Sequence, residues 1–212
     1  MRFGVVVHRL RPVVLGYHII LTGYGHWLAN DPRGSMSREA YAPELAALAE
    51  RHFGRRAAQP PREELRAFYR EAQKRLAHEL LWFDTAERQA LAEAFGRVVR
   101  AHRLTCYACA VLNNHAHLLL RKHRMKAEEM SAALKRAGRA ALIGAGLAPA
   151  GHPVFSADCC HVYKSDVPAL RTCVAYIRGN FAKHRMSEPA YDYITRYDGW
   201  PFPNRSSARR EQ

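Results

Sequence analysis

Two histidines, His115 and His117, stand two positions apart at the start of an apolar run that continues through Leu120. Alternate residues of a strand point to the same face, so a strand at this place would set the two imidazoles side by side. Neutral imidazoles bind divalent cations, and a bound cation can polarise a phosphoryl oxygen. The pair therefore indicates a cation site for phosphate chemistry on a nucleic acid; ordinary packed histidines are the alternative.

A second pair of chemically useful side chains lies far along the chain. Tyr176 and Asn180 are four residues apart in a segment with helical patterning, so they share one face of a helix. If that face packs beside the histidine strand, a phenol, an amide and two imidazoles converge on one point. The chain has ten tyrosines, and a packing role for Tyr176 is the alternative.

The charge of the chain favours a polyanionic partner. There are 33 Lys and Arg against 19 Asp and Glu, which gives a formal net charge of +14. This excess indicates nucleic acid, with a basic but inert surface as the alternative. The apolar stretch from Val13 to Leu21 is short and interrupted by Gly16 and His18, and it lacks a signal-peptide cleavage pattern. We therefore expect a cytoplasmic protein with no membrane partner.

The elements that must position these residues alternate between strand and helix. We expect a single domain over residues 1–203 and a basic flexible tail over 204–212. Asn113 and Asn114 form the turn of a predicted hairpin, and Asp84 or Thr85 caps a helix. The predicted strands are 17–22, 104–112, 115–122 and, strand-like or irregular, 154–163; the predicted helices lie within 37–51, from 62 with an apolar pattern up to 81, from 85 to about 102, over 126–143 and after 166.

Five cysteines occur in a chain without an export signal, so reduced thiols are expected. Cys106 and Cys109 form a CxxC pair within a predicted strand, where residues three apart face opposite ways. A zinc site that joins this pair to Cys159 and Cys160 is the less favoured alternative to buried structural thiols.

Several stretches, in this order, resemble one known family. Leu112-Asn113-Asn114-His115-Ala116-His117-Leu118-Leu119 is similar to that family's Met-Pro-Asn-His-hydrophobic-His-Leu-Leu strand, and Tyr176-Ile177-Arg178-Gly179-Asn180-Phe181 to its Tyr-Ile-x-x-Asn-Pro helix. The other similar stretches are 17–20, 24–28, 31–35, Leu134-Lys135 and 197–201. Over about residues 15–203 the chain thus resembles the REP-associated tyrosine transposases, single-tyrosine transposases of the HUH endonuclease superfamily. Ala116 is small for its position, and Asn113 and Phe181 replace prolines.

The resemblance implies a fold and a chemistry. The fold is α+β, a ferredoxin-like or RRM-like sandwich whose central antiparallel sheet carries the histidine strand, with helices packed on it. The activity is that of a metal-dependent single-stranded DNA endonuclease and strand transferase. Tyr176 is the implied nucleophile, which forms a 5′-phosphotyrosine link and frees a 3′-hydroxyl. His115 and His117, with Asn180 as third ligand, would hold Mg²⁺ or Mn²⁺.

The resemblance also implies a partner and its contacts. The substrate would be single-stranded or hairpin DNA formed by palindromic repeats, which places the protein with the nucleoid; a homodimer is left open. Basic side chains would follow the DNA backbone while exposed bases stack on aromatic rings. The candidate DNA-binding residues are Arg33, Lys135, Arg136, Arg139, Arg178 and Arg205.

Two other readings come from different classes of protein. A histidine-triad nucleotide hydrolase also has alternating histidines, but it requires a third one where this chain has Leu119. A non-catalytic, sequence-specific DNA-binding regulator derived from a transposase would keep the basic surface without the reaction.

Overall fold

The computed structural model describes residues 13–36, 45 and 47–201. Its core is one four-stranded sheet in the order β2-β3-β1-β4, and every pair of neighbouring strands is antiparallel. The strands are β1 (Gly16–Thr22), β2 (Cys106–Val111), β3 (His115–Arg121) and β4 (Cys160–Lys164); the helices are α2 (Arg62–Gln73), α3 (Thr85–Ala101), α4 (Ala127–Gly144) and α5 (Val167–Lys183).

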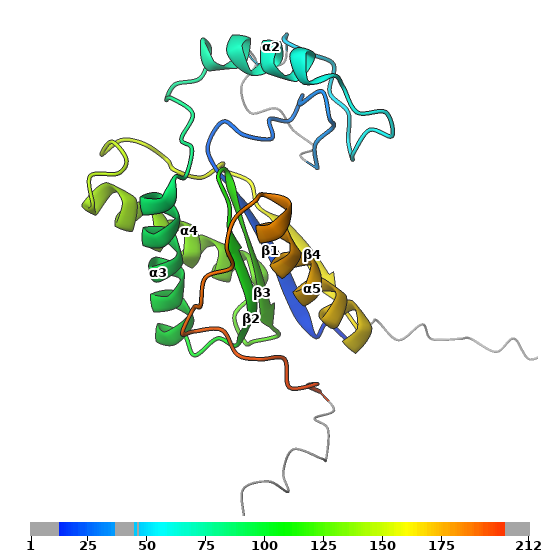
Figure 1. The fold of residues 1–212 in the computed structure, drawn as a ribbon, viewed down its shortest axis with the longest axis vertical. Helices are drawn as coiled ribbons and strands as arrows, with labels where there is room; N and C mark the ends of the chain where they lie inside the picture. Colours follow the sequence, from blue (N-terminus) through cyan, green and yellow to red (C-terminus); the bar gives the residue numbers. More distant parts are fainter. Residues whose placement is uncertain (1–12, 37–44, 46, 202–212) are drawn as a thin grey trace, which may run out of the picture.

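The connections between these elements give a ferredoxin-like topology. Helix α3 joins β1 to β2, the β2–β3 hairpin follows, and α4 leads to β4. Strands β1 and β2 are separated by β3, as in a split βαβ unit. Helices α3 and α4 cover one face of the sheet and α5 covers the other (Figure 1). The predicted α+β sandwich with the histidine strand at its centre is confirmed.

Each face of the sheet has its own core, because side chains alternate along the strands. Ile19, Leu21, Leu118 and Leu120 are buried beneath α3 and α4. Leu119 faces the opposite way and is buried beneath α5 with Leu170, Cys173, Ile177 and Phe181. The histidines of β3 share the α5 face with Leu119, so the sheet's alternation assigns them to the face that α5 covers.

Local signals fix the ends of the elements much as the sequence predicts. The Asp84 side chain accepts hydrogen bonds from the Ala86 and Glu87 backbone N–H groups, and the Glu87 carboxylate accepts one from the Asp84 N–H, which completes a capping box at α3. Asp166 caps α5 by accepting from the Ala169 N–H. The hairpin closes over Asn113 and Asn114, where the Leu112 N–H donates to the His115 carbonyl. The hairpin and both capped helices are confirmed.

Two predictions about local structure are wrong. The apolar pattern predicts helix up to residue 81, but α2 ends at Gln73. Beyond this point the Gln73 side chain accepts a hydrogen bond from the Leu80 N–H, and the side chains of Leu76 and Leu80 lie against Gly25. A β-bulge between Cys106 and Ala108 shifts the register of β2, so Cys106 and Cys109 face the same core.

The short helix expected within 37–51 falls mostly outside the described residues. In the part that is described, the Leu48 N–H donates to the Leu45 carbonyl and marks a turn. The tail at 204–212 also lies outside them. Over the part of the chain that is described, no helix has the length and apolar character to cross a membrane.

The segment between β1 and α3 lies beyond one end of the sheet. It contains the loop after β1 and helix α2, and it stands over the end where β1 finishes and β3 begins (Figure 1). His115 is the first residue of β3, so this segment faces the histidine end of the sheet.

Candidate nucleic-acid processing site

The structure brings the predicted nucleophile to the predicted metal ligands. Tyr176 projects from α5, and its ring centroid lies 5.6 Å from that of His117 and 6.0 Å from that of His18. The phenol is 51% exposed, whereas His117 is buried. The helix therefore sets an accessible hydroxyl-bearing side chain over the inner end of a row of imidazoles.

These imidazoles form a continuous chain across β1 and β3. The Nε2 atoms of His115 and His117 lie 3.1 Å apart, and the Nδ1 atom of His117 lies 3.0 Å from Nε2 of His18. The Nδ1 atom of His115 lies 2.7 Å from Oδ1 of Asn114. If His115 and His117 both bind one cation through Nε2, each Nδ1–H has an acceptor. That of His115 donates to Oδ1 of Asn114, and that of His117 donates to Nε2 of His18. Hydrogen bonds of this kind fix the tautomer and orientation of metal-binding histidines.

The electrostatics of the site favour neutral imidazoles. Burial, together with the smaller effects of nearby His184, His26, Lys183 and Arg33, lowers the pKa of His115 to about 4. Burial, followed by the charges of His115 and His18, lowers the pKa of His117 to about 2. Burial lowers the pKa of His18 to about 4. Both ligand candidates therefore offer lone pairs to a cation at neutral pH without first losing a proton.

Asn180 is buried on the same helix, one turn after Tyr176. Its amide nitrogen donates to the Tyr176 carbonyl at 2.9 Å, so a metal ion would use the amide oxygen. Among residues 13–36, 45 and 47–201, no three His, Cys, Asp or Glu side chains are arranged to hold a metal ion. The role of Asn180 as the third ligand therefore stays a prediction from the sequence.

The sequence analysis did not single out His18, Lys183 or His184. His18 pairs with Leu119, two positions along β3 from His117 and on the same face of the sheet, and strand alternation from Ile19 and Leu21 could have placed it there. The His184 ring lies 6.1 Å from that of His115, at the end of α5. Of the three, Lys183 carries a positive charge, which contributes to the lowered pKa of His115 and of His117.

The basic helix α4 lies on the sheet face opposite Tyr176. Lys135 donates its three Nζ hydrogens to the carbonyls of Ser156, Ala157 and Asp158 at 2.7 to 2.8 Å. Arg139 donates to the carbonyls of His152 and Ala150. These two side chains hold the loop before β4, so their donors are used in hydrogen bonds within the protein.

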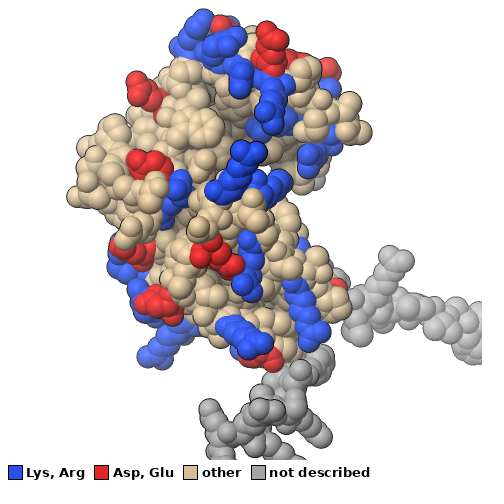
Figure 2. All heavy atoms as spheres, in the orientation of Figure 1, with Lys and Arg blue, Asp and Glu red and all other residues tan. Residues whose placement is uncertain are grey.

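The other DNA-binding candidates have different surroundings. Arg136 is exposed on α4, and Arg178 on α5 forms an exposed ion pair with Glu188. Arg205 falls outside the described residues. Lys and Arg side chains gather over α2 and in the band between α2 and α5 (Figure 2).

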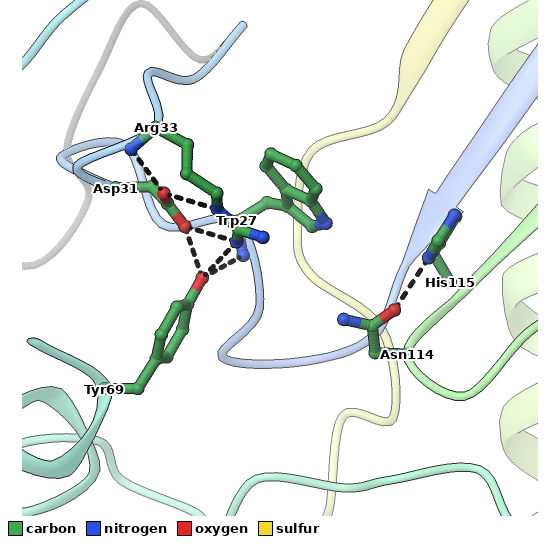
Figure 3. Close-up of polar contacts among 6 residues, drawn as sticks. All are labelled: Trp27, Asp31, Arg33, Tyr69, Asn114 and His115. Carbon is green, nitrogen blue, oxygen red and sulfur yellow. Dashed lines mark hydrogen bonds and ion pairs between the residues drawn. The ribbon is translucent and has the colours of Figure 1, made fainter. Parts of the chain in front are cut away.

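Arg33 is part of a compact cluster near the histidine end. Its guanidinium donates from Nε and Nη2 to the two oxygens of Asp31 at 2.9 and 2.7 Å, and the Tyr69 hydroxyl lies 3.2 Å away. The guanidinium also lies over the ring of Trp27 (Figure 3). Since Asp31 is buried and neutralises this charge, Arg33 acts here mainly as a support for its neighbours.

Two alternative readings lose their structural basis. Leu119, where a histidine triad needs its third histidine, is fully buried beneath α5. All five cysteines are free, and burial raises the pKa of the Cys109 thiol to about 12 and that of Cys173 to about 11. The described residues contain no cluster that matches the zinc site considered from the sequence.

Comparisons with known proteins give similarity at the level of solved structures. No family model and no curated protein matches the chain. A REP-associated tyrosine transposase bound to a REP hairpin aligns with 14% identity and a TM-score of 0.44, over 95% of this chain and 85% of that one. A candidate transposase from Deinococcus radiodurans R1 aligns with 14% identity and a TM-score of 0.38, over 89% of this chain and 100% of that one. Both of those proteins are described as transposases.

Proposed function

We propose that the protein is a metal-dependent endonuclease and strand transferase for single-stranded DNA, with Tyr176 as its nucleophile. The observation that carries this proposal is the position of the Tyr176 ring, 5.6 Å from the His117 ring, at a pair of converging histidine nitrogens. The formal charge of +14 favours a polyanionic substrate.

The residues fit a divalent cation. Two ligands of one cation at about 2.1 Å and roughly right angles are about 3 Å apart, which matches the 3.1 Å between the two Nε2 atoms. His115 and His117 would hold Mg²⁺ or Mn²⁺, with the amide oxygen of Asn180 as a third ligand. Imidazole favours Mn²⁺ over Mg²⁺. The cation would supply Lewis-acid polarisation of a phosphoryl oxygen.

The chain's own residues carry the bond changes. The Tyr176 hydroxyl loses its proton to solvent, and its oxygen attacks the scissile phosphorus. The bond from phosphorus to the 3′-oxygen breaks, and that oxygen takes up a proton to leave a free 3′-hydroxyl. The 5′ phosphate stays linked to Tyr176 as a phosphodiester, so a later attack by a 3′-hydroxyl restores the strand without a nucleotide cofactor.

An adduct assay tests the proposal. Single-stranded DNA that contains a palindromic hairpin is incubated with the protein and Mn²⁺, then denatured and resolved by electrophoresis. We expect a covalent protein–DNA adduct that is absent in Tyr176→Phe. Tyr163→Phe is the matched control, because Tyr163 is also exposed but lies on the α4 side of the sheet, where its hydroxyl contacts Glu128. An adduct that persists in Tyr176→Phe would overturn the assignment.

The alternative is a DNA-binding regulator that has lost the reaction. It predicts tight binding of hairpin DNA with no adduct at any metal concentration, and unchanged binding in Tyr176→Phe. DNA binding and adduct formation measured on the same preparation separate the two functions. Sedimentation of the DNA complex would establish whether one chain or two engage the hairpin.

A further inference from the structure

Trp27 is held in an unusual position near the histidine end of the sheet. Its backbone adopts φ of 53°, in the left-handed region that bulky residues rarely occupy. Its N–H donates to the Tyr69 hydroxyl at 2.9 Å, which ties the loop to α2. Its side chain is nevertheless 40% exposed. The fold thus fixes the backbone of Trp27 while leaving much of its large ring open to solvent.

The ring rests on a rigid, charge-compensated support. The Cζ atom of Arg33 lies 3.7 Å from the centroid of the Trp27 ring. The guanidinium is held in its plane by two hydrogen bonds to Asp31, which is completely buried and also accepts from the Tyr69 hydroxyl. A cation stacked on one face of an indole adds attraction and removes freedom of movement. The support orders the ring before any ligand arrives.

The loop that carries this ring is close to the candidate metal ligands. The Gly23 N–H donates to the Asn114 carbonyl at 2.8 Å, so the loop begins beside the residue that precedes His115. Figure 3 shows the Trp27 ring on the side of its loop that faces Asn114 and His115. Further along this loop, Gly34 has a φ of +88° and lies against the Gly54 backbone so closely that an added Cβ would overlap the Gly54 carbonyl oxygen. The ring and the histidine pair therefore lie at the same end of the sheet.

We propose that the part of Trp27 left uncovered by Arg33 is a stacking site for one unpaired nucleobase, next to the phosphate that His115 and His117 would hold. This deepens the proposed function and rests on it. Stacking on an aromatic ring contributes about 1–3 kcal/mol per base and tolerates any base, since every base has a flat π face. Because Asp31 neutralises Arg33, the cluster is built for a base and not for a phosphate.

A cycle of protein and DNA changes isolates the stacking contribution. The probes are a fluorescein-labelled oligothymidylate of about 15 nucleotides and an abasic strand of the same length. Trp27→Ala should weaken binding of the oligothymidylate about tenfold and leave binding of the abasic strand unchanged. Because no phosphate contact is lost, the dependence of affinity on salt should keep its slope. Equal weakening on both strands would overturn the proposal.

A measurement with Trp27 intact covers the case in which Trp27→Ala does not fold. The chain has three tryptophans, so Trp82→Phe with Trp200→Phe leaves Trp27 as the sole tryptophan, whose emission is followed with unlabelled DNA. We expect its emission to fall when oligothymidylate binds and to stay constant with the abasic strand, because only a stacked base contacts the ring. Constant emission with both strands would overturn the proposal.

A control variant and the adduct assay distinguish failure of the stacking site from failure of the proposed function. Tyr163→Ala removes another aromatic ring, 52% exposed on the α4 side of the sheet, and should leave both affinities unchanged. The binding assay and the Trp27 emission assay require no metal and no cleavage, so both can support the stacking site even when no Tyr176 adduct forms. Conversely, a normal adduct with unaltered oligothymidylate affinity in Trp27→Ala would remove the stacking site and keep the endonuclease.

Discussion

The Nε2 atom of His18 lies 3.0 Å from the Nδ1 atom of His117, a residue 99 positions later in the chain. The contact joins two strands and reaches the ring nitrogen of His117 that does not face His115. If His117 binds a cation through Nε2, His18 must accept the Nδ1–H and so determines which tautomer forms. His18 is therefore a positioning residue for the candidate metal site.

Replacing His18 should weaken metal binding without removing a ligand. We expect His18→Ala to reduce Mn²⁺ affinity about 10- to 100-fold, the usual effect of losing a partner behind a metal-binding histidine. Titration of free Mn²⁺ by electron paramagnetic resonance measures it, and His18→Gln should restore part of the affinity. His161→Ala is the control, because His161 lies on β4 and contacts Ser131 of α4. Equal affinity in His18→Ala and the wild type would contradict the role.

The buried pair of Asp31 and Arg33 should stabilise the fold far more than an exposed pair of the same type. Asp31→Asn leaves the Arg33 guanidinium without its counter-charge, and we expect the free energy of unfolding to fall by about 3 kcal/mol. Asp192→Asn breaks the exposed contact with Arg100 and should change it by less than about 1 kcal/mol. Urea denaturation compares the two; similar losses would contradict the structural assignment.

Stability should decrease as the solution is acidified, in part through His26. Burial lowers its pKa from 6.5 to about 4 in the folded protein. Between these values the unfolded chain binds the proton and the folded chain does not, so lowering the pH favours unfolding. The free energy of unfolding should fall by up to about 3 kcal/mol per such group over this window and show no such change above it.

His26→Gln tests this dependence, since the longer amide side chain can still donate to the Leu81 carbonyl, which His26 reaches through Nε2. Urea denaturation of the variant at pH values across the window should show a shallower loss of stability than the wild type. An identical pH dependence in the two proteins would show that His26 does not contribute.

Lys135 should affect stability and Arg136, its neighbour, should not. Lys135→Met leaves the carbonyls of residues 156–158 without their donor, and we expect a loss of about 2 kcal/mol in urea denaturation. Arg136→Met should stay within about 0.5 kcal/mol, because this side chain is exposed. If Arg136 follows DNA phosphate, its variant should instead lower the salt dependence of DNA binding.

The sequence predicts the sheet and the main convergence of the site because both follow from short-range patterns. Alternation places His115 and His117 on one face, and helical spacing places Tyr176 and Asn180 together. Caps at Asp84 and Asp166 mark helix starts by local hydrogen bonds. The metal ligands and the nucleophile remain predictions of function, whereas the proximity of His115, His117 and the Tyr176 ring is a property of the fold.

What the sequence does not predict depends on contacts between distant segments. The bulge that brings Cys106 and Cys109 to one face is set by the pairing of β2 with β3. Helix α2 stops at Gln73 because the following leucines pack on the loop at Gly25. The sequence predicts Arg33 as a DNA-binding residue. The structure shows that the buried carboxylate of Asp31 already compensates its charge.

Helix α5 has two roles that constrain each other. It covers one core with Leu170, Cys173 and Ile177, and it carries Tyr176 on the adjoining face. A DNA end joined to Tyr176 would thus be anchored to the body of the protein, since moving the nucleophile any distance would expose that core to water. The 5′ end would stay immobile while the free 3′ end diffuses, so the capture of a new 3′ end, and not motion of the helix, would set the order of strand exchange.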